Sequence, residues 1–105
     1  KKPKPSSSYA FCSDTTYSES ILPWINGVDV LYHEATFTNK DKARAKATLH
    51  STAEQAAKIA RMAKVGKLYF GHLSARYDDA EVHLKEAKVH FENCFEAVEG
   101  EIVKL

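Results

Sequence analysis

The stretch "VDVLYHEATF" (residues 28–37) decides the fold, because a strand-forming run within it turns abruptly polar. Its first six residues are rich in β-branched and aromatic side chains, which predicts a strand over residues 28–33. The strand ends with His33 beside Glu34, an adjacent base and acid. Either the strand has only reached the surface, or it delivers both side chains to a reaction site. The other elements of the chain bear on this choice.

Strand and helix patterns alternate along the rest of the chain. The predicted strands are residues 8–13, 28–33 and 67–73, and the predicted helices are residues 18–27, 51–65 and 78–91. Residues 38–50 are predicted to form a loop with one weak helix. A predicted hairpin over residues 94–105, with its turn at Glu99 and Gly100, closes the chain. The clearest helix opens with a capping box, formed by Thr52 with Gln55 or by Ser51 with Glu54, and Gly66 ends it. This alternation predicts an α/β fold with parallel strands joined by right-handed crossovers.

Size and composition limit the classes of protein to consider. With 105 residues, the chain has the length of one domain, and its net charge of +1 gives no global argument for nucleic-acid binding. No apolar run approaches the ~18 residues of a membrane span, and no signal-peptide pattern opens the chain, so we expect no membrane contact. Cys12 and Cys94 lie far apart in apolar surroundings, which predicts free thiols and a cytoplasmic location.

The first residues differ in composition from the rest. Residues 1–7 are basic and rich in proline and serine, which is typical of a linker, and the first residue is a lysine. We therefore expect the chain to be a piece of a longer protein whose folded part here covers residues 8–105.

Polar residues follow the first three predicted strands, at Asp14, at His33 with Glu34, and at His72. In parallel sheets, ligands bind beyond the carboxyl ends of the strands, so these residues indicate a site. Asp14 is either a turn residue or a carboxylate that bridges two divalent metals. A neutral imidazole at His72 suits zinc or manganese.

His50 stands immediately before the clearest helix. It is either a loop histidine or a proton donor held at a helix start, where the dipole favours a neutral imidazole and attracts phosphate. His83 and His90 fall in the last predicted helix among charged residues, which favours solvent-exposed side chains.

Four segments occur in the order found in one family. They are "CSDTTY" (residues 12–17), "LYHEATF" (31–37), "HSTAEQAA" (50–57) and "GHLSARY" (71–77). Together they resemble the C-terminal part of ribonuclease Z, a tRNA 3′-end endonuclease with the metallo-β-lactamase fold. The resemblance implies the C-terminal half of an αββα sandwich, with one mixed sheet and helices on one side. The N-terminal half with its HxHxDH metal motif would then be missing, and no HxH occurs in this sequence.

The resemblance also implies a role for each matching residue. Asp14 would bridge two divalent metal ions, with zinc expected, and His72 would be a terminal ligand of one of them. His50 would assist the transition state or protonate the leaving oxygen, and Glu34, with His33 beside it, would orient His50. The residues expected to meet RNA phosphate are Ser74, Arg76 and Tyr77.

The implied activity is hydrolysis of a phosphodiester to remove the 3′ trailer of precursor tRNA. Asp14 and His72 are too few ligands for two metals, because zinc normally takes about four, so we expect the chain alone to be inactive. A single sheet would expose its inner face, so the expected partners are precursor tRNA, the missing N-terminal half and a second copy in a homodimer.

Two alternatives stay open at this point. Other phosphodiesterases of the same fold, acting on cyclic nucleotides or small esters, share much of the metal framework. A non-catalytic α/β module with incidental histidines is the other alternative, and it predicts that alanine at Asp14, His50 or His72 leaves the activity of a longer parent unchanged.

Overall fold

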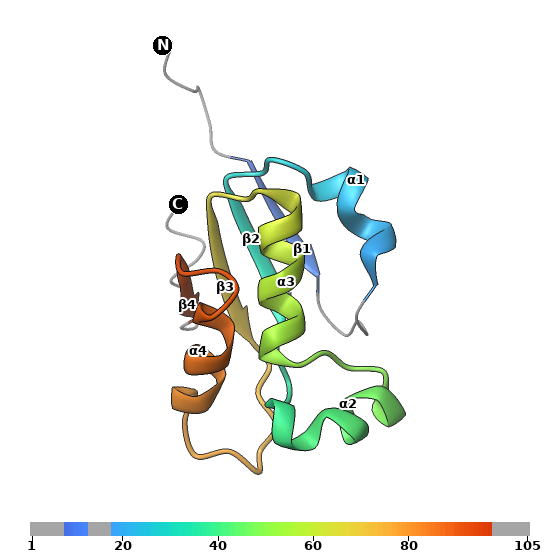
Figure 1. The fold of residues 1–105 in the computed structure, drawn as a ribbon, viewed down its shortest axis with the longest axis vertical. Helices are drawn as coiled ribbons and strands as arrows, with labels where there is room; N and C mark the ends of the chain where they lie inside the picture. Colours follow the sequence, from blue (N-terminus) through green and yellow to red (C-terminus); the bar gives the residue numbers. More distant parts are fainter. Residues whose placement is uncertain (1–7, 13–17, 98–105) are drawn as a thin grey trace.

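The computed structural model describes residues 8–12 and 18–97 of the 105 (Figure 1). Its strands are β1 (Tyr9–Cys12), β2 (Val30–Glu34), β3 (Lys67–Gly71) and β4 (Cys94–Glu96). Its helices are α1 (Leu22–Ile25), α2 (Lys42–Thr48), α3 (Ala53–Ala63) and α4 (Glu81–Lys88), with short 3-10 turns at Glu19–Ile21 and Asn39–Asp41. The alternation of strands and helices expected from the sequence is therefore confirmed in the described part of the chain.

The four strands form one sheet in the order β1-β2-β3-β4, and every neighbouring pair is parallel. The predicted hairpin begins with β4, but its turn at Glu99 and Gly100 lies outside the described residues. The antiparallel part of the predicted mixed sheet therefore stays a prediction, as does the linker over residues 1–7.

The core lies between the sheet and helix α3. Leu31, Leu68 and Phe70 from β2 and β3 are fully buried. The helix presents small side chains and one large one to them; its fully buried residues are Ala53, Ala56, Ala57, Ile59 and Ala60. Because alanine adds so little bulk, α3 can lie close against the strands.

Helix α3 begins with the predicted capping box. The Thr52 hydroxyl accepts a hydrogen bond from the backbone N–H of Gln55 (3.1 Å), and the Gln55 side chain accepts one from the N–H of Thr52 (2.9 Å). The helix ends at Ala63, with Lys64 in the left-handed region at φ 56°. Gly66 has a different role from the predicted helix stop, because a Cβ there would lie 2.6 Å from the backbone oxygen of Asp29.

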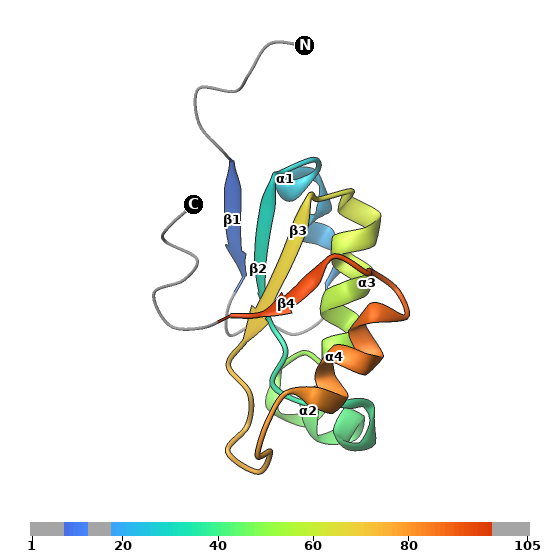
Figure 2. The same ribbon diagram turned by 90° about the vertical axis from the view of Figure 1, so that its left-hand side faces the viewer.

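The helices lie on one side of the sheet, as Figure 2 shows for α1, α3 and α4. The opposite side carries a row of aromatic residues in register across all four strands: Phe11, Tyr32, Tyr69 and Phe95. The rings of the first pair are 5.6 Å apart and those of the second pair 5.5 Å apart, centre to centre. No helix of the described residues covers this row, which we call the aromatic face.

The expectation that His83 and His90 are solvent-exposed is wrong; His83 lies on α4, and His90 lies just beyond its end at Lys88. The ring of His83 is fully buried, 6.2 Å from the ring of Phe70 and 4.7 Å from that of Tyr77. His90 is half-buried, and its Nε2 lies 2.8 Å from a carboxylate oxygen of Glu54. The charged neighbours in the sequence gave no sign of this burial, because they occupy the other faces of the helix.

Two further observations concern the cysteines and the helices. Cys12 and Cys94 are free thiols, as predicted. Among the residues that the structure describes, none of the helices has the length and hydrophobicity that a membrane span requires.

Candidate active site

The site lies where the chain leaves β2. Residues 35–37 continue the direction of the strand and hydrogen-bond through their backbone to residues 71–74 on one side and to residues 51–53 on the other. Three segments that are distant in the sequence are therefore held side by side just beyond the carboxyl end of the sheet. The side chains near the start of each segment converge on one point.

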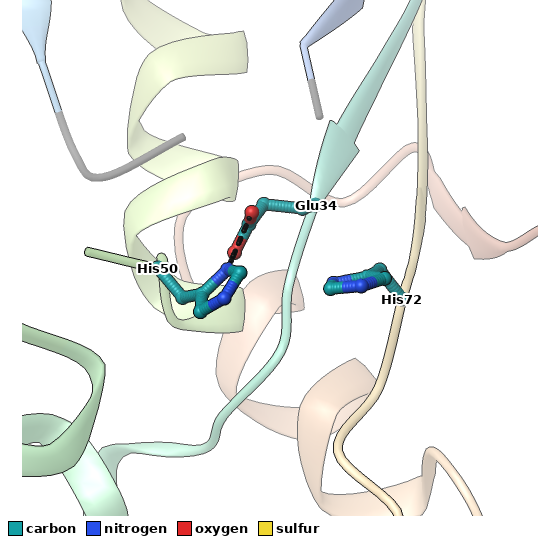
Figure 3. Close-up of side chains that lie close together, drawn as sticks. All are labelled: Glu34, His50 and His72. Carbon is teal, nitrogen blue, oxygen red and sulfur yellow. Dashed lines mark hydrogen bonds and ion pairs between the residues drawn. The ribbon is translucent and has the colours of Figure 1, made fainter. Parts of the chain in front are cut away.

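The side chain of Glu34 lies at the centre of the site and is fully buried. Its carboxylate lies 2.9 Å and 3.0 Å, through its two oxygens, from Nδ1 of His50 (Figure 3). It also accepts hydrogen bonds from the backbone N–H of Ser51 (2.8 Å) and from the hydroxyl of Thr36 (2.9 Å). Because a carboxylate only accepts, Nδ1 of His50 carries a hydrogen, and Nε2 is left for other partners.

His72 completes the cluster. Its ring lies 5.4 Å from that of His50, centre to centre, and its Nδ1 lies 3.0 Å from the hydroxyl oxygen of Thr36. The backbone of His72 is in the left-handed region at φ 63°, a conformation that is uncommon for residues other than glycine and that concentrates at functional sites. This conformation turns the ring of His72 toward β2, where Figure 3 shows it facing Glu34 and His50.

The donor set fits a divalent metal. Glu34, His50 and His72 each offer one ligand atom, and these atoms lie within 4.8 Å of one another. A carboxylate with two imidazoles is a set that zinc and similar metals accept. The carboxylate of Glu34 is already occupied by three donors, however, so the exposed imidazole of His72 is better placed to bind a metal.

His33 does not join this cluster. Its ring is buried, and its Nδ1 donates to the backbone oxygen of Glu34 (2.8 Å), not to the carboxylate. Within the described part of the chain its Nε2 has no hydrogen-bond partner. Burial lowers the pKa of His33, because it disfavours the charged imidazolium. The base and the acid that are adjacent in the sequence therefore point to different surroundings.

The segment expected to contact RNA lies beyond β3. The Tyr77 hydroxyl accepts from the backbone N–H of Thr38 (3.0 Å) and donates to the carboxylate of Asp41 (2.5 Å), and this bond lowers the pKa of Asp41. Arg76 is about two-fifths exposed, and its guanidinium lies 3.6 Å from the other carboxylate oxygen of Asp41. The Ser74 hydroxyl accepts from the backbone N–H of Arg76 (3.4 Å). A pocket of about 310 Å³ opens beside Arg76 and Tyr77.

The structure brings together three of the predicted site residues, Glu34, His50 and His72. Asp14 lies outside the described residues, so its place as a metal ligand stays a prediction. Sequence reasoning missed Thr36, which contacts both Glu34 and His72. Thr36 lies in the quoted segment "LYHEATF", but a threonine at a strand end is too common to stand out as a site residue.

The fold is that of the metallo-β-lactamase class. A metallo-β-lactamase fold protein from Bacillus subtilis, YhfI, matches with a TM-score of 0.77 over 86% of this chain and 36% of its own, at 24% sequence identity. The short form of human tRNase Z matches with a TM-score of 0.59 over 82% of this chain and 27% of its own, at 26% identity. No family model matches the chain.

Curated relatives that share one name match most of the chain. Ribonuclease Z of Azobacteroides pseudotrichonymphae is 58% identical over 92% of this chain and 34% of its own length. Ribonuclease Z of Parabacteroides distasonis is 55% identical over 88% of this chain and 30% of its own length. Ribonuclease Z of Bacteroides fragilis is 48% identical over 96% of this chain and 33% of its own length. The chain is thus a homologue of ribonuclease Z over most of its length, and it spans about a third of these relatives. The resemblance inferred from the four motifs is confirmed.

Proposed function

We propose that this chain is the C-terminal part of a metal-dependent endoribonuclease that removes 3′ trailers from precursor tRNA by phosphodiester hydrolysis in the cytoplasm. The observation that carries the proposal is the pairing of His50 with the buried carboxylate of Glu34 at 2.9 Å, beside His72. The identity of 48–58% to proteins named ribonuclease Z supports the same substrate.

In this proposal His50 either donates a proton to the leaving oxygen or stabilises negative charge on the phosphate. Glu34 holds its ring through Nδ1, so that Nε2 is presented in a fixed direction. An imidazole oriented in this way by a carboxylate can donate a proton to the leaving oxygen or stabilise charge on the phosphate. His33 supports the same strand end by its bond to the backbone oxygen of Glu34.

Asp14 and His72 would hold the metal ions, with zinc as the proposed metal. When bound, two divalent metals lower the pKa of a water and stabilise the attacking and leaving oxygens. Two ligands are fewer than zinc's usual four, so the remaining ligands are proposed to come from the N-terminal half of the protein. On this basis the 105-residue chain alone is inactive.

Ser74, Arg76 and Tyr77 are proposed to face the RNA. The guanidinium of Arg76 is exposed and can present two N–H groups to a phosphate, whereas the Tyr77 hydroxyl is engaged by Thr38 and Asp41. We therefore assign the phosphate contact mainly to Arg76. Tyr77 would hold the loop in place.

The aromatic face is proposed to pack against the N-terminal half of the protein. The chain spans about a third of its relatives, so most of such a protein is available to cover the face. In the absence of that half, a second copy of the chain would cover it and form a homodimer.

The proposed function is tested by cleavage of a precursor tRNA with the full-length protein that contains this chain, or with the chain mixed with its N-terminal half. Zinc-dependent release of a 5′-phosphorylated trailer is expected, and His50→Ala or Asp14→Ala should abolish it. The matched control is His90→Ala, because His90 also pairs with a glutamate at 2.8 Å but lies outside the site. Cleavage that survives both His50→Ala and Asp14→Ala would overturn the assignment.

A further inference from the structure

The hydroxyl of Thr36 lies between two groups of the site. Its oxygen is 2.9 Å from a carboxylate oxygen of Glu34 and 3.0 Å from Nδ1 of His72. The side chain is nearly fully buried, and the backbone oxygen of Thr36 accepts from the N–H of Ser74 (2.9 Å). The residue is thus fixed to both the β2 and the β3 ends of the site.

The direction of each hydrogen bond follows from the groups involved. A hydroxyl has one hydrogen, and the carboxylate of Glu34 can only accept, so the hydrogen of Thr36 points to Glu34. The oxygen of Thr36 must then accept from Nδ1 of His72. With its hydrogen on Nδ1, the neutral ring of His72 has a lone pair on Nε2.

We propose that Thr36 is a positioning residue that holds His72 with Nδ1 protonated and Nε2 free to bind a metal. The role of His72 as a ligand rests on the proposed function, but the tautomer does not. Glu34 orients His50 directly and His72 through the hydroxyl of Thr36, so one buried carboxylate sets the direction of both imidazoles. Groups that hold a ligating histidine in this way strongly affect metal affinity.

A change of Thr36 to valine keeps the shape of the side chain and removes the hydroxyl. Glu34 then loses one of its donors, and Nδ1 of His72 loses its acceptor. Serine at the same position keeps the hydroxyl and loses a methyl group. The two variants therefore separate the hydrogen bond from the packing.

The decisive measurement is the tautomer of His72 in the metal-free full-length protein. It is read by NMR from the ¹⁵N shifts of labelled histidine rings, with the His72 signals assigned by a His72→Gln variant. We expect Nδ1–H in the wild type and in Thr36→Ser, and a mixture of tautomers in Thr36→Val. The matched control is Thr38→Val, because Thr38 is also buried but its hydroxyl contacts Tyr77. Nε2–H in the wild type, or an unchanged tautomer in Thr36→Val, would overturn the proposal.

Zinc titration of the same proteins gives a second readout. Loss of the supporting bond should weaken zinc binding roughly 10- to 100-fold in Thr36→Val, with Thr36→Ser and Thr38→Val close to the wild type. Equal affinities in all four proteins would also overturn the proposal. Because the tautomer is measured without metal or RNA, a protein with the expected tautomer and no tRNA cleavage would overturn the proposed function alone.

Discussion

His50 and Glu34, sixteen residues apart in the sequence, are joined by a hydrogen bond of 2.9 Å between Nδ1 and a carboxylate that is fully buried. A buried carboxylate is costly unless donors surround it, and the backbone N–H of Ser51 and the hydroxyl of Thr36 supply two more. These hydrogen bonds fix the orientation of the His50 ring. They also occupy the carboxylate of Glu34, which therefore acts by holding His50 in place.

Glu34→Gln should therefore impair the full-length enzyme strongly. The amide keeps the size of the side chain but turns an N–H₂ group toward donors, so His50 loses its fixed tautomer. We expect kcat for precursor tRNA to fall roughly 10²- to 10⁴-fold. The free energy of unfolding should fall by about 1–3 kcal/mol, because a buried donor is left unpaired.

The measurement is steady-state cleavage together with thermal unfolding. Glu54→Gln is the matched control, because Glu54 pairs with His90 at 2.8 Å on a different part of the surface. Cleavage by Glu34→Gln at the rate of this control would show that the pair does not act in the reaction.

Acid should destabilise the fold through His83. Burial lowers its pKa below the usual value, and this outweighs the backbone of Thr36 and the carboxylate of Asp79, which both act to raise it. Below about pH 6.5 the unfolded chain binds a proton that the folded chain resists, so the free energy of unfolding falls as the pH drops through that window. His33, whose pKa is also lowered, adds to the same trend.

Chemical denaturation between pH 5 and pH 8 measures this effect. His83→Phe keeps an aromatic ring between Phe70 and Tyr77 and removes the titrating group, so it should flatten the dependence. A dependence as steep in this variant as in the wild type would assign the effect to other groups.

Thr52→Ala should destabilise the start of helix α3. The hydroxyl of Thr52 accepts from the N–H of Gln55, and removal of such a cap costs about 1 kcal/mol. Thr48→Ala is the control, because Thr48 is exposed and its hydroxyl donates to a carbonyl in the last turn of α2; there we expect a change within about 0.5 kcal/mol. Urea denaturation of both variants compares the two, and equal losses would contradict the capping role.

The sequence was informative about the site where several strand ends had to meet. Parallel strands bring their carboxyl ends to one edge, so the positions of Glu34 and His72 followed from the strand pattern alone. His50 stood out by its place before the clearest helix, and the family resemblance added its role. The backbone contacts of residues 35–37 with both flanking segments bring these positions together into a cluster, and no pattern of residue types predicts them.

The parts of the arrangement that the sequence did not predict depend on the direction in which each side chain turns. His33 and Glu34 are adjacent, but consecutive residues of a strand turn to opposite sides, so only one of them can face a given site. His83 stands among charged residues along the chain, yet its own face of α4 packs on Phe70. Thr36 is recognisable only through the two partners of its hydroxyl, which are set by tertiary contacts.

The aromatic face leads to a prediction for the isolated chain. Phe11 and Phe95 at its two ends are 56% and 40% exposed, and an apolar surface of this kind tends to associate. We expect the 105-residue chain to self-associate, and Phe95→Lys to shift it toward the monomer by placing a charge in the contact. Trp24→Lys is the control, because Trp24 is 84% exposed on α1, on the other side of the sheet.

Light scattering after size exclusion, over a range of concentrations, gives the mass. A chain that stays monomeric at high concentration, or a Trp24→Lys variant that dissociates as readily as Phe95→Lys, would show that the aromatic face is not the contact. Addition of the N-terminal half should dissociate the wild-type oligomer, because both compete for the same face.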